Sequence, residues 1–265
     1  MRVLICVKQV PVTSRPVIDP VTGILLRSEM DTQINPFDRC ALEVMARCKE
    51  QNPDTRITAL CMGPYSAKSV LRDALAYCAD EAVLIQDPAF AGSDAMATSR
   101  ILAAAVQRIE EAEGPFDLVV SGAKSVDGET SVTGPLLAER LGLFALTYAV
   151  SLHIADGKGM LTQETDTGTR EVSFSLPCLI TFSKTKGLSF YPKVSDIIKA
   201  QNKHIRMFCC SDLPGLNPSR TGVSGSASRV VEIQRSETRR AGIRIVNQNT
   251  ELTAQILVKE LAGIL

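Results

Sequence analysis

SGAKSVDGETSVTGP, residues 121–135, connects a short apolar run to a helix-forming segment. The run before it, FDLVVSG (116–122), is rich in β-branched residues and predicts a buried strand. The segment from Glu129 to Leu141 predicts a helix, which Gly142 is expected to close because glycine favours helix C-termini. The sequence therefore predicts a strand, a loop and a helix in succession, the unit from which parallel sheets are built.

The same succession recurs through the first half of the chain. Pro36 and Asp38 suit the start of the first helix. Ser66 is expected to cap the second helix, and Ser93 or Asp94 the third. The predicted strands are 2–8, 56–62, 82–86 and 116–122, and the predicted helices are 35–49, 67–79, 93–111 and 129–141, with a loop-like segment at 9–34. This alternation predicts an α/β fold with a parallel sheet that is covered on both faces.

The pattern changes after residue 142. Segments 145–154, 160–165 and 170–182 predict antiparallel strands. Asp156-Gly157 between the first two is a hairpin signal. We therefore expect a small antiparallel addition to the sheet, followed by a loop and a helix in the basic segment 184–203.

The C-terminal quarter differs in composition. Residues 211–228 are rich in Ser, Gly and Pro, which is typical of a linker. Residues 229–265 combine a strand-like piece with an amphipathic helix, whose apolar stripe is formed by Leu252, Ile256, Leu257 and Leu261. We expect a domain at 1–210, a linker at 211–228, and a C-terminal arm at 229–265 whose helix docks on a partner subunit.

Composition narrows the function classes. The chain of 265 residues has 29 Lys and Arg against 29 Asp and Glu, which argues against broad electrostatic binding to nucleic acid or a membrane. No stretch is long and apolar enough to span a bilayer, and MRVLICVKQV at the N-terminus is too short an apolar run for a signal peptide. We expect a cytoplasmic protein. The eight cysteines form no C-x-x-C pair, so a disulfide framework or a metal site is not expected.

The loop at 121–135 has two interpretations. Small residues at its start allow close approach to a ligand, and the hydroxyl groups and N–H groups that follow suit phosphate at a helix N-terminus. The same residue types also cap helices that bind nothing. Neither G-x-G-x-x-G after the first strand nor G-x-x-x-x-G-K-[ST] is present, which disfavours a Rossmann dehydrogenase and a P-loop NTPase.

Catalytic side chains are scarce. The two histidines, His153 and His204, lie in or beside predicted strand or helix ends, and a structural role is favoured for both. No Ser/His/Asp order and no carboxylate pair with a clear role is found. A nucleotide-binding protein with so little acid–base chemistry is better interpreted as a carrier than as a hydrolase. A run of lysines could form a partner surface or simply a solvated face: Lys184, Lys186, Lys193, Lys199 and Lys203.

Several stretches, taken in order, resemble the β subunit of electron transfer flavoproteins. The matching stretches are VLICVKQVP (3–11), IDPVTG (18–23), INPFD (34–38), CMGP (61–64), RDALAYCAD (72–80), VDGETSVTGP (126–135), YPKVSDIIKA (191–200) and RRAGI (239–243). Each is modest alone, but the ordered set spans nearly the whole chain.

This resemblance implies a Rossmann-like α/β domain of the adenine nucleotide-binding type, with a C-terminal arm that wraps the α subunit. It implies FAD on the α subunit and a second nucleotide on this chain, either AMP or a second FAD. The segment that matches the family's partner-recognition loop is about Thr185 to Ser195. The residues expected to touch the nucleotide are Cys6, Asn35, Pro36, Phe37, Asp38, Met62, Gly122, Ala123, Lys124, Ser125, Val126, Asp127, Gly128, Glu129, Thr130, Ser131, Val132 and Thr133.

The loop sequence bears on which nucleotide is bound. AMP-binding members tend to have an Asn-Gln-Thr run where this chain has Ser131-Val132-Thr133, and electron-bifurcating members tend towards D-G-D-T-A-Q-V-G-P. Asp127, Gly128 and Thr130 fit the second pattern, whereas Glu129 and Val132 depart from it. The comparison favours FAD.

Three functions remain in view. The favoured one is a redox subunit, not a stand-alone enzyme, which takes a hydride from NADH and divides the electrons between a flavin dehydrogenase and ferredoxin or flavodoxin. The second is an ordinary subunit with structural AMP, which accepts electrons from acyl-CoA dehydrogenases. A Rossmann-like nucleotide sensor or ATP-using enzyme is the third, although Lys8 to Ser14 lacks a pyrophosphate loop of the S-G-G-x-D-S kind. A structural subunit with an empty site is a further alternative.

Overall fold

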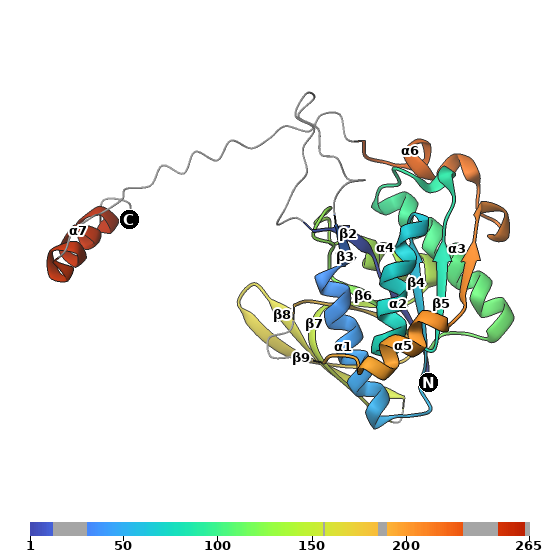
Figure 1. Cartoon of the computed structure of the whole chain (residues 1–265), viewed down its shortest axis with the longest axis horizontal. Helices are drawn as coiled ribbons and strands as arrows, with labels where there is room; N and C mark the ends of the chain where they lie inside the picture. Colours follow the sequence, from blue (N-terminus) through green and yellow to red (C-terminus); the bar gives the residue numbers. More distant parts are fainter. Residues whose placement is uncertain (13–30, 156, 185–189, 230–248, 263–265) are drawn as a thin grey trace. The chain divides into compact units, whose positions relative to one another are not determined.

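The computed structural model describes residues 1–12, 31–155, 157–184, 190–229 and 249–262. These residues belong to two compact units, Met1–Arg229 and Val230–Leu265. The first unit is built on one large sheet with helices on both faces (Figure 1). This arrangement confirms the predicted α/β class.

The large sheet has the strand order β11-β5-β4-β1-β6-β10-β7-β8-β9. Every neighbouring pair from β11 to β7 is parallel, and β7, β8 and β9 pair antiparallel. The predicted parallel sheet with a small antiparallel addition is therefore confirmed. The strands are β1 (Arg2–Cys6), β4 (Arg56–Met62), β5 (Glu81–Ile85), β6 (Leu118–Gly122), β7 (Phe144–Ala155), β8 (Lys158–Thr165), β9 (Gly168–Ser175), β10 (Cys178–Phe182) and β11 (Ile205–Phe208).

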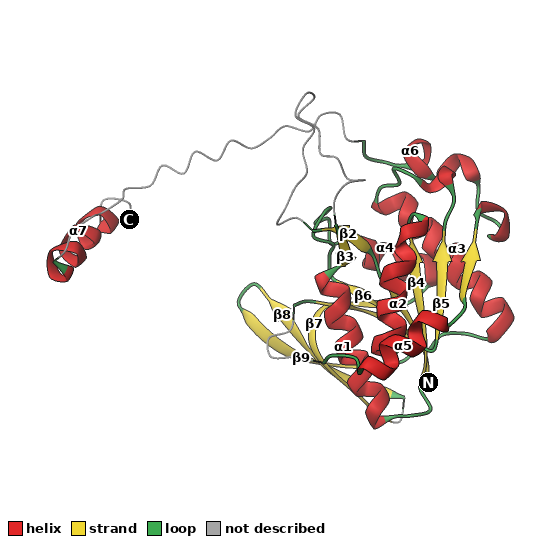
Figure 2. Ribbon diagram, viewed as in Figure 1, coloured by secondary structure: helices red, strands yellow, loops and turns green. Residues whose placement is uncertain are grey.

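Helices cover the two faces of this sheet (Figure 2). The longer helices of the first unit are α1 (Pro36–Gln51), α2 (Lys68–Tyr77), α3 (Ala95–Glu113), α4 (Thr133–Leu141) and α5 (Val194–Asn202). Shorter elements are the strands β2 (Gln9–Pro11) and β3 (Thr32–Ile34), the helix α6 (Gly222–Gly225), and the 3₁₀ turns η2 (Tyr65–Ala67), η3 (Pro88–Phe90), η4 (Cys210–Asp212) and η5 (Pro218–Arg220). The strands β2 and β3 pair antiparallel at the two ends of the segment that was predicted to be loop-like.

Alternating side chains of the buried strands supply two hydrophobic cores. In β1, Val3 and Ile5 pack into the core under α1, α2 and α5, whereas Leu4 packs into the core under α3 and α4. All three are fully buried. Successive side chains of a strand point to opposite faces, so a strand in the middle of a two-sided sheet must be apolar throughout. This requirement explains the continuous apolar runs that predicted these strands.

Two local predictions were wrong. Ser66 does not cap α2, because it lies inside η2 and its hydroxyl donates to Gln9 Oε1 at 3.1 Å. The segment 170–182 is two strands: β9 extends the antiparallel edge, and β10 turns into the buried parallel region between β6 and β7. The two strands differ in burial, because β10 is buried throughout and β9 is largely exposed.

The segment 211–228, predicted as a linker, lies within the first unit. Thr221 is 1% exposed, and its hydroxyl donates to the carbonyl of Pro218 at 2.7 Å. The carboxylate of Asp94, the N-cap of α3, accepts hydrogen bonds from the backbone N–H groups of Ala227 and Ser228. The polar composition of this segment therefore serves turns and caps that fasten it to α3.

The second unit contains α7 (Thr250–Ala262), which begins after Asn249, whose side chain accepts from the N–H of Glu251 at 3.0 Å. Leu252, Leu257 and Leu261 are each about half exposed. The predicted strand-like piece lies outside the described residues. In the described part of the chain, no helix is both long enough and apolar enough to cross a membrane.

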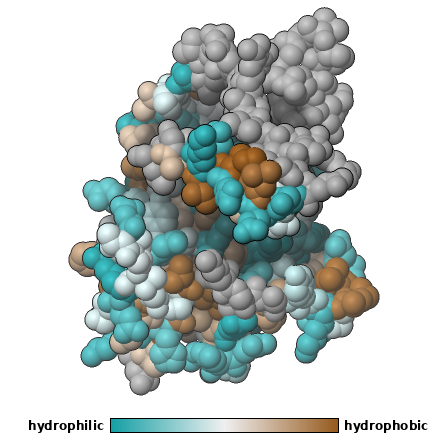
Figure 3. Space-filling model, turned by 90° about the vertical axis from the view of Figure 1, so that its left-hand side faces the viewer, coloured by the Kyte–Doolittle hydropathy of each residue, from teal (hydrophilic) through white to brown (hydrophobic). Residues whose placement is uncertain are grey.

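Apolar side chains also reach the surface of the first unit. On the strands β7 and β8, Phe144 is 85% exposed and Met160 is 49% exposed. Figure 3 colours each residue of one view by its hydropathy and shows apolar residues next to hydrophilic ones at the surface. Such side chains are available to a partner subunit.

Gly122 closes β6 where the first turn of α1 presses against it. A methyl group here would lie 2.3 Å from Asp38 Oδ1 and 2.7 Å from Phe37 Cβ. We expect Gly122→Ala to lower the free energy of unfolding by about 1–3 kcal/mol, the cost of overpacking a closely fitted site. In Gly128→Ala the nearest contact is an ordinary 3.4 Å to Ser125 Oγ. Urea unfolding of both variants checks this, and equal midpoints would contradict it.

Candidate nucleotide site

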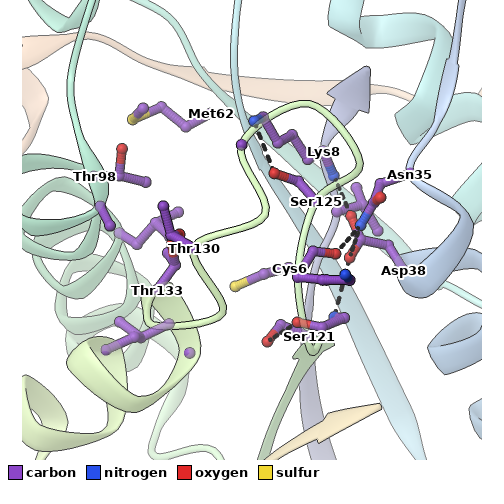
Figure 4. Close-up of a pocket in the computed structure, with 18 of the residues that line it drawn as sticks. Cys6, Lys8, Asn35, Asp38, Met62, Thr98, Ser121, Ser125, Thr130 and Thr133 are labelled. Carbon is purple, nitrogen blue, oxygen red and sulfur yellow. Dashed lines mark hydrogen bonds between the residues drawn. The ribbon is translucent and has the colours of Figure 1, made fainter. Parts of the chain in front are cut away.

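A cavity of about 290 Å³ opens at the carboxyl ends of β1, β4 and β6. The chain runs from β1 through β4 to β5 on one side, then returns through α3 to β6 on the other side of β1. This reversal is the topological switch point of the sheet, the place where open α/β sheets bind ligands. The first turns of α3 and α4 and the loop between β6 and α4 complete the walls (Figure 4).

The Asp38 carboxylate ties together the strand ends beneath the cavity. It accepts hydrogen bonds from the backbone N–H of Lys8 at 2.7 Å and of Gly122 at 3.0 Å. The side-chain amide of Asn35 donates a third bond to it at 2.9 Å. One side chain in the first turn of α1 therefore sets the spacing between the ends of β1 and β6.

This carboxylate is deeply buried, with 5% of the residue exposed. Burial raises the pKa of Asp38 to about 7, while the hydrogen bonds from Asn35, Lys8 and Gly122 favour the charged form and limit the rise. Burial of the Asp38 carboxylate therefore costs free energy, and the three hydrogen bonds that it accepts offset part of that cost.

Asn35 links this tie to the loop after β6. Its amide also donates to the carbonyl of Lys124 at 2.9 Å, and its side-chain oxygen accepts from the N–H of Val126 at 3.3 Å. The residue is 1% exposed, and its own N–H donates to the carbonyl of Lys8. Asn35 thus makes the entry to the loop rigid without capping α1 by its side chain.

A second tie holds the middle of the loop. Lys8 Nζ lies 2.7 Å from Asp127 Oδ1 and 2.8 Å from Oδ2, and 3.3 Å from Ser125 Oγ. Burial acts to raise the pKa of Asp127, but the hydrogen bond and charge of Lys8 outweigh it, and the pKa lies below its usual value. Asp127 therefore remains a carboxylate that anchors the loop to the end of β1.

The loop itself is strained, and the predicted helix start was wrong. The helix α4 begins at Thr133, not at Glu129. Glu129 and Ser131 have φ angles of 49° and 56°, in the left-handed region that a right-handed helix cannot contain. Backbone strain of this kind costs about 1–3 kcal/mol per residue and is concentrated at ligand sites. The predicted start was wrong because the acidic and hydroxyl residues of this loop are also the residue types that are common at helix N-termini.

The N-terminus of α4 is open to the cavity. Its N-cap residue is Val132, and no side chain caps the helix. Thr133 and Gly134 line the cavity, as do the hydroxyl-bearing Thr130 and Ser131. Unpaired N–H groups at a helix start, together with hydroxyl donors, form an environment that favours an anion such as phosphate. By contrast, the Asp94 side chain already caps α3 at 2.9 Å.

The rest of the wall is largely apolar. Leu60, Met62, Leu102 and Leu137 also line the cavity, and Cys6 adds its sulfur. Figure 4 shows Thr130 and Thr133 on the side to which the Cys6 sulfur points. Burial raises the pKa of the Cys6 thiol far above its usual value, so it stays protonated. An apolar wall facing an anion site suits a ligand with a flat ring and a phosphate.

The structure places the expected contact residues in two groups. Those that line the cavity are Cys6, Asn35, Asp38, Met62, Gly122, Ala123, Lys124, Ser125, Gly128, Thr130, Ser131 and Thr133. Those that do not line it are Pro36, Phe37, Val126, Asp127, Glu129 and Val132. Phe37 lies under two ammonium groups, with Lys124 Nζ 5.7 Å and Lys184 Nζ 5.2 Å from its ring centre. Asp127 and Phe37 are therefore part of the support for the loop.

Sequence reasoning missed the first turn of α3 as a wall of the site. Ser93, Asp94, Ala95 and Thr98 all line the cavity. The signal was present, because a predicted helix start directly after a strand of a parallel sheet lies at the ligand-binding edge. Lys8, at the end of the first predicted strand, lines the cavity as well, although it was not among the expected contact residues. Neither histidine is among the residues that line this cavity.

Comparisons with known proteins identify the family of the chain. A family model described as "Electron transfer flavoprotein domain" matches residues 22–202. The chain is 34% identical over 261 residues to the caffeyl-CoA reductase-Etf complex subunit CarD of Acetobacterium woodii, covering 98% of both chains. It is 35% identical over 262 residues to the electron transfer flavoprotein subunit beta of Thermoanaerobacterium thermosaccharolyticum, again covering 98% of both. Protein FixA of Azorhizobium caulinodans is 34% identical over 264 residues, covering 98% of this chain and 94% of its own.

The chain belongs to the electron transfer flavoprotein family. The matches cover nearly its whole length, and one of these relatives is named as a β subunit. The resemblance found in the sequence is therefore confirmed. Within this family, a cavity without a histidine or a reactive thiol suits a protein that holds and positions a carrier and leaves the redox chemistry to it.

The buried Asp38 predicts a specific pH dependence of stability. Its pKa in the folded protein, about 7, lies above the usual 3.8, so the folded state binds the proton more tightly than the unfolded state does. The stability contributed by this group is fully present below about pH 3.8 and is lost as pH rises towards 7. We expect the unfolding free energy of the wild type, minus that of Asp38→Asn, to fall across this window. A difference that is flat or rises with pH would refute the assignment.

Proposed function

We propose that this chain is the β subunit of a heterodimeric electron transfer flavoprotein and that the cavity holds an adenine nucleotide. The observation that carries the proposal is the uncapped start of α4, which opens into a cavity at the switch point of the sheet. Phosphate at this helix start would accept from the free N–H groups and from the hydroxyls of Thr130 and Thr133. The adenine would lie against the apolar wall.

The strained loop supports this assignment. Left-handed Glu129 and Ser131 and the ties through Asn35 and Lys8 hold the loop in one conformation before any ligand arrives. A site that is already ordered loses less entropy on binding, which raises affinity. A loop that only connected a strand to a helix would not require this strain.

We propose FAD as the nucleotide, with AMP as the alternative. A cavity of about 290 Å³ is near the lower end of the range for small-molecule sites and suits the adenosine phosphate part that both share. The choice therefore rests on the loop, where Asp127, Gly128 and Thr130 fit the pattern of electron-bifurcating members. The relative CarD is named as a subunit of a caffeyl-CoA reductase-Etf complex.

Flavin bound here would supply the electron-transfer chemistry, and the chain's residues would bind it, orient it and surround it with apolar groups. The proposed partners are an α subunit carrying a further FAD, a flavin-dependent dehydrogenase, and, for bifurcation, NADH with ferredoxin or flavodoxin. With AMP in the site, an acyl-CoA dehydrogenase would be the electron donor. Tyr191 and Val194, which are 80% and 72% exposed, support a partner contact near the start of α5.

The ultraviolet–visible spectrum of the purified complex with its α subunit tests the proposal. Two flavins per heterodimer are expected if this cavity holds FAD. One flavin together with extractable AMP would overturn the choice of FAD while supporting the nucleotide site. A heterodimer with neither nucleotide in this chain would overturn the site itself.

Thr130 offers a test of the loop. It lines the cavity but lies before α4, so it is not needed to start the helix. We expect Thr130→Val to lower the nucleotide retained per heterodimer, because a hydroxyl donor of about 1 kcal/mol is removed, while the fold stays intact. Thr169→Val, on exposed β9, is the matched control. Equal nucleotide content in both variants, measured after gel filtration, would show that Thr130 does not contact the ligand.

A further inference from the structure

Three arginines gather on the first unit around α3. Arg100 lies on α3, Arg140 in the last turn of α4, and Arg220 at the end of η5. Arg100 Nη1 donates to the carbonyls of Arg220 and Gly225, and the charges of Arg100 and Arg220 both act on Arg140. We call these three residues the arginine cluster. None of them lines the cavity.

The cluster has no acidic partner. Among the residues that the structure describes, none of the three arginines forms an ion pair with a carboxylate. Burial and then the charges of Arg100 and Arg220 hold the pKa of Arg140 below its usual value. A helix C-terminus favours one cation, which accounts for Arg140 but not for the other two. Three like charges so close together weaken the isolated fold.

Two of the three guanidinium groups, those of Arg100 and Arg140, are nevertheless held in place. Arg140 Nε donates to Ser99 Oγ at 2.9 Å, and Ser99 is fully buried. Arg100 is fixed by the carbonyl of Gly225 at 2.8 Å. These bonds leave other N–H groups of Arg100 and Arg140 without a hydrogen-bond partner among the described residues. Fixed guanidinium forks match the geometry of carboxylates.

The cluster lies next to the end of the first unit. The segment that carries Arg220 continues through Gly225, which Arg100 contacts, to Arg229, where the unit ends. Ala227 and Ser228 are anchored to Asp94 in the same place. The chain beyond Arg229 is the C-terminal arm, for which the sequence predicts docking on a partner subunit. The cluster therefore lies beside the last described residues before the predicted arm.

We propose that the arginine cluster is a docking surface for carboxylates of the α subunit. This surface lies beside Arg229, after which the predicted C-terminal arm begins. This inference rests on the proposed function, because it requires an α subunit. Acidic side chains there would neutralise the three charges and would pair with N–H groups that face no partner in this chain.

The test uses the complete heterodimer, with a fluorescent label on the α subunit. The variant Arg140→Gln/Arg220→Gln removes two charges from the cluster, and Arg47→Gln/Arg56→Gln removes two exposed charges elsewhere as the matched control. Dissociation on dilution is measured at about 0.01 M and about 1 M ionic strength, where the screening lengths are about 30 Å and about 3 Å. Nucleotide content is measured for each complex.

We expect the cluster variant to raise the heterodimer Kd by about tenfold at low ionic strength, with the difference from wild type largely lost at high salt. The control variant should match the wild type, and all three complexes should keep their nucleotide. Equal Kd values for the two variants would overturn the proposal. So would loss of nucleotide from the cluster variant alone, which would assign the arginines to that ligand, or an unchanged Kd with slower electron transfer to a dehydrogenase, which would assign them to that partner. A wild-type complex without nucleotide would count against the proposed function instead.

Discussion

The hydrogen bonds accepted by the Asp38 carboxylate determine where the site lies and how wide it is. The donors are the N–H groups of Lys8 and Gly122 at the ends of β1 and β6, together with the Asn35 amide. Strand ends at a switch point tend to separate, because the connections from them leave in opposite directions. A buried carboxylate bridges them, and Gly122 has no side chain so that α1 can approach. The burial cost is visible in the raised pKa of Asp38.

Contacts within the chain hold the loop after β6 in place. Asn35 fixes its entry and Lys8 its middle, and the strain at Glu129 and Ser131 then brings the chain into α4 with an uncapped first turn. The tie residues thus form a framework, whereas backbone N–H groups and hydroxyls face the cavity. This division suits the proposed role, in which backbone N–H groups and hydroxyls would bind the nucleotide while the tie residues hold the loop.

Much of the fold could be predicted from the sequence, because buried strands in a two-sided sheet must be apolar on both faces. The boundaries that failed depend on tertiary contacts. The residue type of Glu129 does not predict a left-handed conformation. The acidic and hydroxyl residues around it are also common at the start of ordinary helices. The resemblance implies that Asp127 and Phe37 touch the nucleotide; in the structure Asp127 pairs with Lys8, and the ring of Phe37 lies near the ammonium groups of Lys124 and Lys184. The segment 211–228 has the composition of a linker because caps and turns use the same polar residues.

Amide hydrogen exchange in the heterodimer, with its nucleotide bound and after its removal, tests the central claim most directly. The account predicts that binding slows exchange in the peptide spanning 128–136, where the N–H groups at the start of α4 would donate to phosphate. The amides of Lys8 and Gly122 should be protected in both states, because Asp38 accepts from them regardless of the ligand. Protection that appears elsewhere, with exchange in 128–136 unchanged, would contradict the account.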